Sequence, residues 1–218
     1  MDLLYFLRTR LSFVDELYNS TVQPYEDRKC KIEAHEEPYV DLRDPEYADE
    51  PAFLEEWQEA DDAMMVIGHW CFCMVHASLK AYLKSYLGPV DVTADSSALD
   101  RELRSTGGKS WFERYRLLFL KALGVDWNSG PVKIGELEQL NLTRDDLIHN
   151  VDVLSLNVPM SADHAERFPN SLFTDDLWYG VPGGRVRIDH ERLQLAIRLV
   201  LEFCGWLETF RDDTVRYF

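Results

Sequence analysis

Residues 51–87, PAFLEEWQEADDAMMVIGHWCFCMVHASLKAYLKSYL, form the longest stretch of the chain that no strong helix breaker interrupts. Pro51 suits the first turn of a helix, and Gly88 with Pro89 follows as a typical helix end. Apolar side chains recur between these limits at helical spacing, and Gly68 marks the place where the helix bends most easily. The stretch therefore predicts one helix of about 30 or more residues that forms the spine of a helical bundle.

Four more segments predict helices that pack around this spine. Their apolar residues follow the spacing of a helix, and the last segment is apolar enough to be largely buried. Ser110 and Gly124 are favourable caps at the two ends of the second segment, and Asp189 is a favourable cap at the start of the last. The four segments are residues 3–18, 111–123, 134–151 and 189–210.

The region between the last two helices predicts a small β element. Residues 177–188, LWYGVPGGRVRI, place two short apolar runs on either side of a Pro-Gly-Gly turn signal, which favours a hairpin. A loop is expected over residues 154–176, and a short helical turn over residues 97–104. The predicted fold class is all-α: a bundle of about five helices, one of them very long, plus a small β-hairpin. We expect a single domain over residues 1–218, with a loop and hairpin insertion at 152–188.

Acidic residues gather in one part of the chain. Between Glu26 and Asp62 there are 15 acidic and 4 basic residues, so this part carries a net charge of −11 out of the total of −16. The helical pattern dissolves into charge and proline over residues 20–50, which predicts a long acidic connection that wraps the surface as a solvated loop. The alternative is an acidic flap that mimics a polyanion and covers a basic site. No local feature separates the two.

The composition of the chain limits the classes of protein to which it can belong. A chain of 218 residues with 46% hydrophobic residues can bury a sizeable core, and its net charge of −16 argues against a surface that binds nucleic acid broadly. Its four cysteines form no dense framework, as is typical of a reduced intracellular protein. Asp2 and Arg8 argue against a signal peptide, and no run reaches the ~18 to 20 apolar residues of a membrane span. We expect a soluble, cytoplasmic protein that does not enter the membrane.

The chain's candidate chemistry lies in residues 136–150, ELEQLNLTRDDLIHN. Arg144 and His149 are the strongly basic and the imidazole side chain of this segment, and they stand five residues apart near the end of a predicted helix. Five residues correspond to roughly 500° of helical rotation, so the two side chains lie about 140° apart around the axis. Either Arg144 reaches around the helix, or a second copy of the helix completes the site.

This segment resembles the motif of the HEPN superfamily (higher eukaryotes and prokaryotes nucleotide-binding domains). In this motif an Arg is followed directly by a polar residue, here Asp145, and four residues in all separate the Arg from the His. The long helix, residues 111–127, the motif helix and the closing helix also match the family's order and rough spacing. The acidic connection and the insertion depart from it. The resemblance implies a homodimer in which the paired Arg and His residues form a metal-independent RNA-cleaving site, as in toxin–antitoxin or phage-defence proteins.

The residue types fit that chemistry. His149 can take the proton of a ribose 2′-hydroxyl or protonate the leaving oxygen, and Arg144 can hold the phosphorane by a two-pronged hydrogen bond. Asp145 would orient Arg144 or His149, Asn150 would donate to a phosphate or base, and Arg114 lies on a modest basic edge that can approach RNA. The implied product is a 2′,3′-cyclic phosphate, and no metal or other cofactor is expected.

Two other functions stay open. Some members of the family bind only a nucleotide, RNA or a protein partner such as a cognate antitoxin or regulatory protein, and the net charge of −16 favours such a role. The third possible function is that of a helical interaction module in which the motif occurs by chance. In that case Arg144 and His149 would only complement the helix dipole, and Asp145 or Asp146 would pair with a neighbouring base.

Two further patterns have simpler structural explanations. His69, Cys73 and His76 share one helix face, but a single helix does not comfortably supply three tetrahedral ligands, so we expect a buried His that faces the 134–151 helix. The Gly-Gly-Lys-Ser run at 107–110 resembles the end of a phosphate loop, but no strand precedes it, and a helix N-cap explains it.

Overall fold

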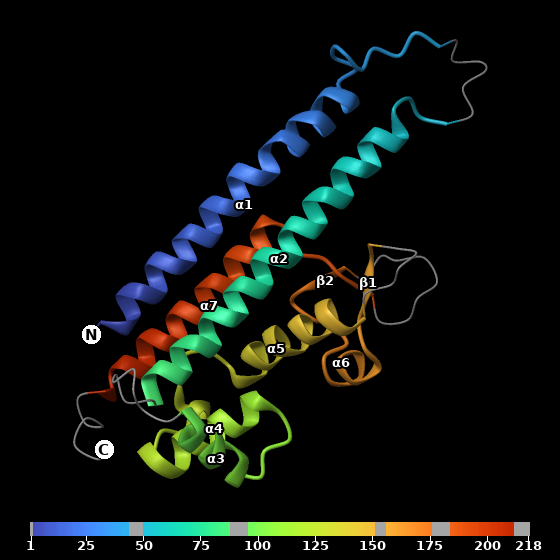
Figure 1. The fold of residues 1–218 in the computed structure, drawn as a ribbon. Coiled ribbons are helices and arrows are strands. Elements are labelled where there is room, and N and C mark those ends of the chain that lie inside the picture. Colours follow the sequence, from blue (N-terminus) through green and yellow to red (C-terminus); the bar gives the residue numbers. More distant parts are fainter. Residues whose placement is uncertain (1, 44–49, 88–95, 151–155, 176–183, 212–218) are drawn as a thin grey trace.

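The computed structural model describes residues 2–43, 50–87, 96–150, 156–175 and 184–211. Seven α-helices and a small antiparallel sheet make up this described part, which confirms the all-α class with a small β insertion. The two longest helices are α1 (Leu3–Glu33) and α2 (Leu54–Leu87), and they pack side by side along most of their length. Figure 1 shows that their far ends project beyond the rest of the molecule as a two-helix arm.

The prediction of an acidic loop over residues 20–50 was wrong for its first part. Residues 20–33 continue α1, although Pro24 lies inside this helix. Buried or half-buried side chains recur every three or four residues at Tyr18, Val22, Tyr25, Lys29 and Ile32, which keeps one stripe of α1 against α2. A two-helix arm buries only one narrow stripe of each helix, so charge dominates its sequence and hides the helical pattern. Residues 44–49 of the expected connection lie outside the described residues.

Helix α7 (His190–Glu208) completes the main bundle by packing against both α1 and α2. Asp189 caps it as predicted, since its side chain accepts a hydrogen bond from the backbone N–H of Arg192. Helix α5 (Ile134–His149) packs against α2 and α7 from another side. The long helix α2 is therefore the shared wall of the bundle, as its sequence predicts, but it begins at Leu54, so Pro51 lies before the first turn and not within it.

Helix α2 also bears on the membrane question. Contrary to the expectation that no segment is apolar enough, α2 is long and apolar enough to cross a membrane by length and composition. Half of that apolar window is buried inside the fold, and one such helix is by itself weak evidence for a membrane span.

Two smaller helices and a 3₁₀ turn close one end of the bundle: α3 (Ser96–Ser105), α4 (Trp111–Leu123) and residues Trp127–Ser129. The predicted caps of α4 are confirmed, because the Ser110 side chain accepts from the N–H of Glu113 and Gly124 adopts a left-handed conformation with φ of 68°. Trp127 is fully buried and meets the rings of Phe112, Phe119 and Phe203 edge-on. This aromatic cluster joins α4 to α7.

The insertion after α5 folds into a three-stranded antiparallel sheet with one short helix. Its strands are β1 (Val158–Pro159), β2 (Thr174–Asp175) and β3 (Arg185–Val186), in the order β1-β3-β2, and α6 (Ala162–Arg167) follows β1. The predicted loop over 154–176 thus contains α6 and two strands, whose short length hid them in the sequence. The first half of the predicted hairpin, residues 177–183, lies outside the described residues.

Gly68 fixes how closely the insertion approaches α2. A Cβ atom at this position would lie 1.9 Å from the carbonyl oxygen of Ile188, just after β3. Neither backbone can yield without moving a core element, since Ile188 is buried. Gly68 is therefore required by close packing and not, as its sequence position suggests, only for a bend.

We predict that Gly68→Ala lowers the free energy of unfolding by about 2 kcal/mol or more, because the added methyl group forces α2 and the segment at Ile188 apart. The matched control is Gly205→Ala in α7, where a Cβ meets no atom within 4 Å. That change should stabilise the protein by up to about 1 kcal/mol through helix propensity. Chemical denaturation of the three proteins measures both effects, and a Gly68→Ala protein as stable as wild type would contradict the packing argument.

Candidate functional site

Helix α5 carries the sequence motif and is held firmly by its buried side. Leu137, Leu140 and Leu147 are buried along one face, and Asn141 and Thr143 are buried beside them. This face contacts α2, α7, the sheet and α6, as the arrangement in Figure 1 shows. Arg144 follows Leu137 by seven residues and Leu140 by four, so it lies on the side of α5 that faces α2, where its charge acts on His76. His149 is exposed at the end of the helix, so one fixed backbone carries the two residues on different sides.

Arg144 is paired within its own helix. Its Nη1 donates a hydrogen bond of 2.8 Å to Oδ1 of Asp145, and the two side chains are 32% and 41% exposed. The structure thus joins these two predicted site residues by an ion pair. The same pairing is what the interaction-module alternative expects, because it neutralises the guanidinium internally.

His149 is the last residue of α5 and is exposed. No hydrogen bond or ion pair joins it to Arg144 in the described part of the chain. The two side chains therefore do not form a complete site within one copy, as the roughly 140° between them predicts. A substrate that touches both must span the helix, or a second copy must supply the missing group.

Asn150 does not take the role that the sequence suggested. Its side-chain amide donates hydrogen bonds of 3.0 Å to Asp146 and 3.3 Å to the carbonyl oxygen of Pro159. Both amide hydrogens are engaged in holding the end of α5 to β1. Asn150 is thus a structural link and has no free donor for a phosphate or base.

Asp146 is a buried acidic residue whose structural importance was not predicted from the sequence. It is 3% exposed and accepts hydrogen bonds from Nδ1 of His164 at 2.6 Å, the backbone N–H of Ser161 at 3.2 Å and the side chain of Asn150. His164 is itself fully buried. Asp146 stands about 180° around the helix from Leu137, on the polar side of the sequence pattern, so its burial against the insertion left no signal in the sequence.

Helix α4 borders the motif through Trp111 and not through Arg114. The Nε of Arg114 donates a 2.8 Å hydrogen bond to the carbonyl oxygen of Gly108, which closes the loop before α4. The ring of Trp111 instead meets His76 of α2 edge-on, with centroids 5.1 Å apart. Arg114 is therefore engaged in its own loop, although its charge can still add to the potential around α5.

His76 is the buried histidine expected to face the motif helix. Its Nε2 lies 3.3 Å from Oδ1 of Asn141 on α5, which confirms that prediction. Burial, and to a smaller degree the positive charge of Arg144, lower the pKa of His76 to about 4, so it is neutral at pH 7. His76 therefore helps to hold α5 and is no proton donor at neutral pH.

A bound metal and similarity to known proteins are the two remaining guides to the chemistry of this site. Among the described residues, no group of three or more His, Cys, Asp or Glu side chains is placed to hold a metal ion. Searches of protein-family models, of curated proteins and of solved structures found no match to this chain. The candidate site therefore consists of a guanidinium and an imidazole carried by one rigid helix, α5.

We predict that the two neighbouring acids, Asp145 and Asp146, differ sharply in what they do for stability. Asp146→Ala should cost about 3 kcal/mol or more, because it leaves the buried His164 without its partner. Asp145→Ala, in which a half-exposed ion pair is lost, should change stability by less than about 1 kcal/mol. Urea denaturation of both variants checks this, and equal losses would contradict the assignment of Asp146 as the structural acid.

Proposed function

We propose that the chain is a metal-independent endoribonuclease of the HEPN type whose site is completed by a second copy of the chain. The observation that supports this most directly is that one rigid helix, α5, carries both an exposed His149 and a partly exposed Arg144. The Asp146–His164 pair beneath them holds that end of the helix in one position. Rigid presentation of the reacting groups is what general acid–base catalysis needs.

The reaction is an intramolecular transesterification at one phosphodiester of the RNA. The ribose 2′-oxygen attacks the adjacent phosphorus as His149 of one copy accepts the 2′-hydroxyl proton. The bond to the 5′-oxygen breaks as that oxygen takes a proton from water, so each site needs one His149 and, from the second copy, one Arg144. Arg144 holds the phosphorane oxygens, which carry the developing charge, and Asp145 keeps the guanidinium in place. The products are a 2′,3′-cyclic phosphate and a 5′-hydroxyl end.

The proposal includes a setting for this activity. We place the protein in the cytoplasm as a homodimer that acts in a toxin–antitoxin or phage-defence role, with RNA as substrate and an antitoxin or regulatory protein as its partner. The acidic arm formed by α1 and α2 would repel RNA from that side, because residues 26–62 carry most of the net charge. RNA would then approach from the side of α5, away from the arm tip (Figure 1).

The second candidate function is a non-catalytic HEPN-type protein that binds a nucleotide, RNA or protein partner. The Arg144–Asp145 ion pair favours it, since a guanidinium that is already neutralised binds a phosphate less readily. The engagement of Asn150 with Asp146 and Pro159 favours it too. Under this function the same helix face binds a ligand but performs no bond cleavage.

We predict that the purified chain cleaves a mixed RNA pool in EDTA and leaves cyclic-phosphate ends. His149→Ala and Arg144→Ala should each lower the rate by a factor of about 100 or more, because each removes a group that acts on the transition state. Arg198→Ala, which removes an exposed arginine on α7, is the control and should cut like wild type. If no protein cuts and the pool binds to wild type but not to Arg144→Ala, the binding function replaces the nuclease.

We also predict that the two inactive variants rescue each other. If Arg144 of one copy works with His149 of the other, a mixed dimer of Arg144→Ala and His149→Ala keeps one complete site of two. Random exchange of subunits puts half of the chains in such dimers, so an equimolar mixture should regain about a quarter of the wild-type rate. No recovery after verified subunit exchange would place both groups of each site in the same copy.

A further inference from the structure

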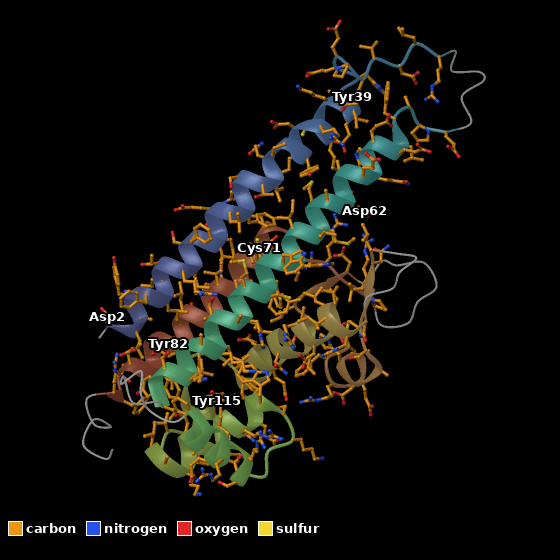
Figure 2. The ribbon with its side chains drawn as sticks, viewed as in Figure 1. Asp2, Tyr39, Asp62, Cys71, Tyr82 and Tyr115 are labelled. Atoms are coloured by element: carbon orange, nitrogen blue, oxygen red, sulfur yellow. The ribbon has the colours of Figure 1, made fainter. Side chains whose placement is uncertain are left out.

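A polar cavity lies beside α2 and the inserted sheet, and it shares no residue with the Arg144–His149 site. Its volume is about 480 Å³, and its walls come from α1, α2 and the sheet of the insertion. Sites for small molecules have volumes of roughly 300–1,000 Å³, so the cavity is large enough for a metabolite and larger than a single inorganic ion needs. Figure 2 places Asp62, one of its wall residues, on α2 near this sheet.

Three cations converge on this cavity in a strongly acidic protein: Lys29 of α1, Arg185 of β3 and Arg187 just after it. Two of them are used by the fold. The Lys29 ammonium lies 2.5 Å from Asp61 and over the ring of Trp57, and Arg187 lies 3.1 Å from the same carboxylate. Asp61 therefore ties the arm, α2 and the sheet together and builds a rigid wall.

Arg185 is the cation that the fold leaves for a ligand. Its Nη1 donates a 2.6 Å hydrogen bond to the neutral amide of Asn157, and its Nε is buried without a partner among the described residues. No carboxylate of the described chain lies within 4 Å of this guanidinium, although the protein has 39 acidic residues. A partly buried guanidinium with an open donor is stabilised by an anion that can accept from it.

Asp62 sets which anions fit. Its carboxyl group lines the same cavity, and burial, followed by the charge of Asp61, raises its pKa. A carboxyl group beside Arg185 competes with an incoming anion for the guanidinium, but it also accepts hydrogen bonds from hydroxyl groups. A ligand that combines a phosphate with hydroxyl groups satisfies both residues at once.

We infer that this cavity, between Lys29, Asp62, Asn157 and Arg185, binds a small phosphate monoester that also carries hydroxyl groups. Arg185 holds the phosphate from the sheet side, with Asn157 orienting its guanidinium and Lys29 adding positive charge across the cavity. Asp62 accepts from a ligand hydroxyl. A sugar phosphate and a nucleoside monophosphate share this chemistry, so the test must separate them.

The test is isothermal titration calorimetry of the full chain at low ionic strength with ribose 5-phosphate, adenosine monophosphate, inorganic phosphate and adenosine. The two monoesters should bind saturably and adenosine should not. If the nucleotide binds more tightly than the sugar phosphate, the base contributes. If the two bind equally, the sugar phosphate is the recognised unit. Failure of both monoesters to bind, or equal binding of adenosine and its monophosphate, would overturn the inference.

Two substitutions with opposite expected signs sharpen the test. Arg185→Gln should weaken binding of the monoester about tenfold or more, because a charge-assisted hydrogen bond is lost. Asp62→Asn should tighten it severalfold, since the amide removes a competing negative charge and still accepts from a hydroxyl. Poor folding cannot produce tighter binding, so the Asp62→Asn result decides even if Arg185→Gln does not fold. Unchanged or weaker binding by Asp62→Asn contradicts the assignment.

Arg198→Gln is the matched control for the loss of an arginine, because Arg198 is exposed on α7. It should bind like wild type. His149→Ala should also bind like wild type, so the result for this cavity is independent of whether the chain cleaves RNA. Loss of binding in His149→Ala would mean that the two sites are coupled and would overturn the placement in this cavity alone.

Discussion

The simultaneous packing of α2 against α1, α7, α5 and the inserted sheet is the constraint on which the structure depends. A helix that is buried on several sides must offer small or apolar residues on each of them, and α2 does so with Gly68, Phe72, Val75 and Leu79. The approach of Ile188 to Gly68 is the tightest part of this arrangement. Because α2 fixes the positions of α5 and the sheet together, both polar regions of the protein inherit their geometry from it.

Buried polar pairs then lock the insertion to this framework. Asp146 and His164 join α5 to α6, while Asp61 joins α1, α2 and the segment after β3 through Lys29 and Arg187. The strands of the insertion are only two residues long, so backbone pairing alone gives them little stability. Charged side chains from the helices supply what the short strands lack. These side chains meet only in the folded state, which makes the position of the insertion specific.

Charge is unevenly distributed over the molecule. Residues 26–62, at the end of the arm, carry most of the net negative charge, while Arg144 on α5 and Arg185 beside the sheet are partly exposed cations. A protein with a net charge of −16 can therefore still present local sites for phosphate groups. The proposed RNA site depends on a second copy for completion, whereas the cavity beside Arg185 is complete within one chain.

The sequence by itself determined the helical class, the spine formed by α2, the caps of α4 and α7 and the segment that carries Arg144 and His149. These features depend on local spacing and capping, which the chain expresses residue by residue. Tertiary structure alone decided that α1 runs on to Glu33, that Asp146 and not Asp145 is the buried acid, and that Asn150 is structural. It also brought Lys29, Asp62 and Arg185 to one cavity. The residues that meet in these places lie far apart in the sequence, and contacts over such distances leave no local periodic signal.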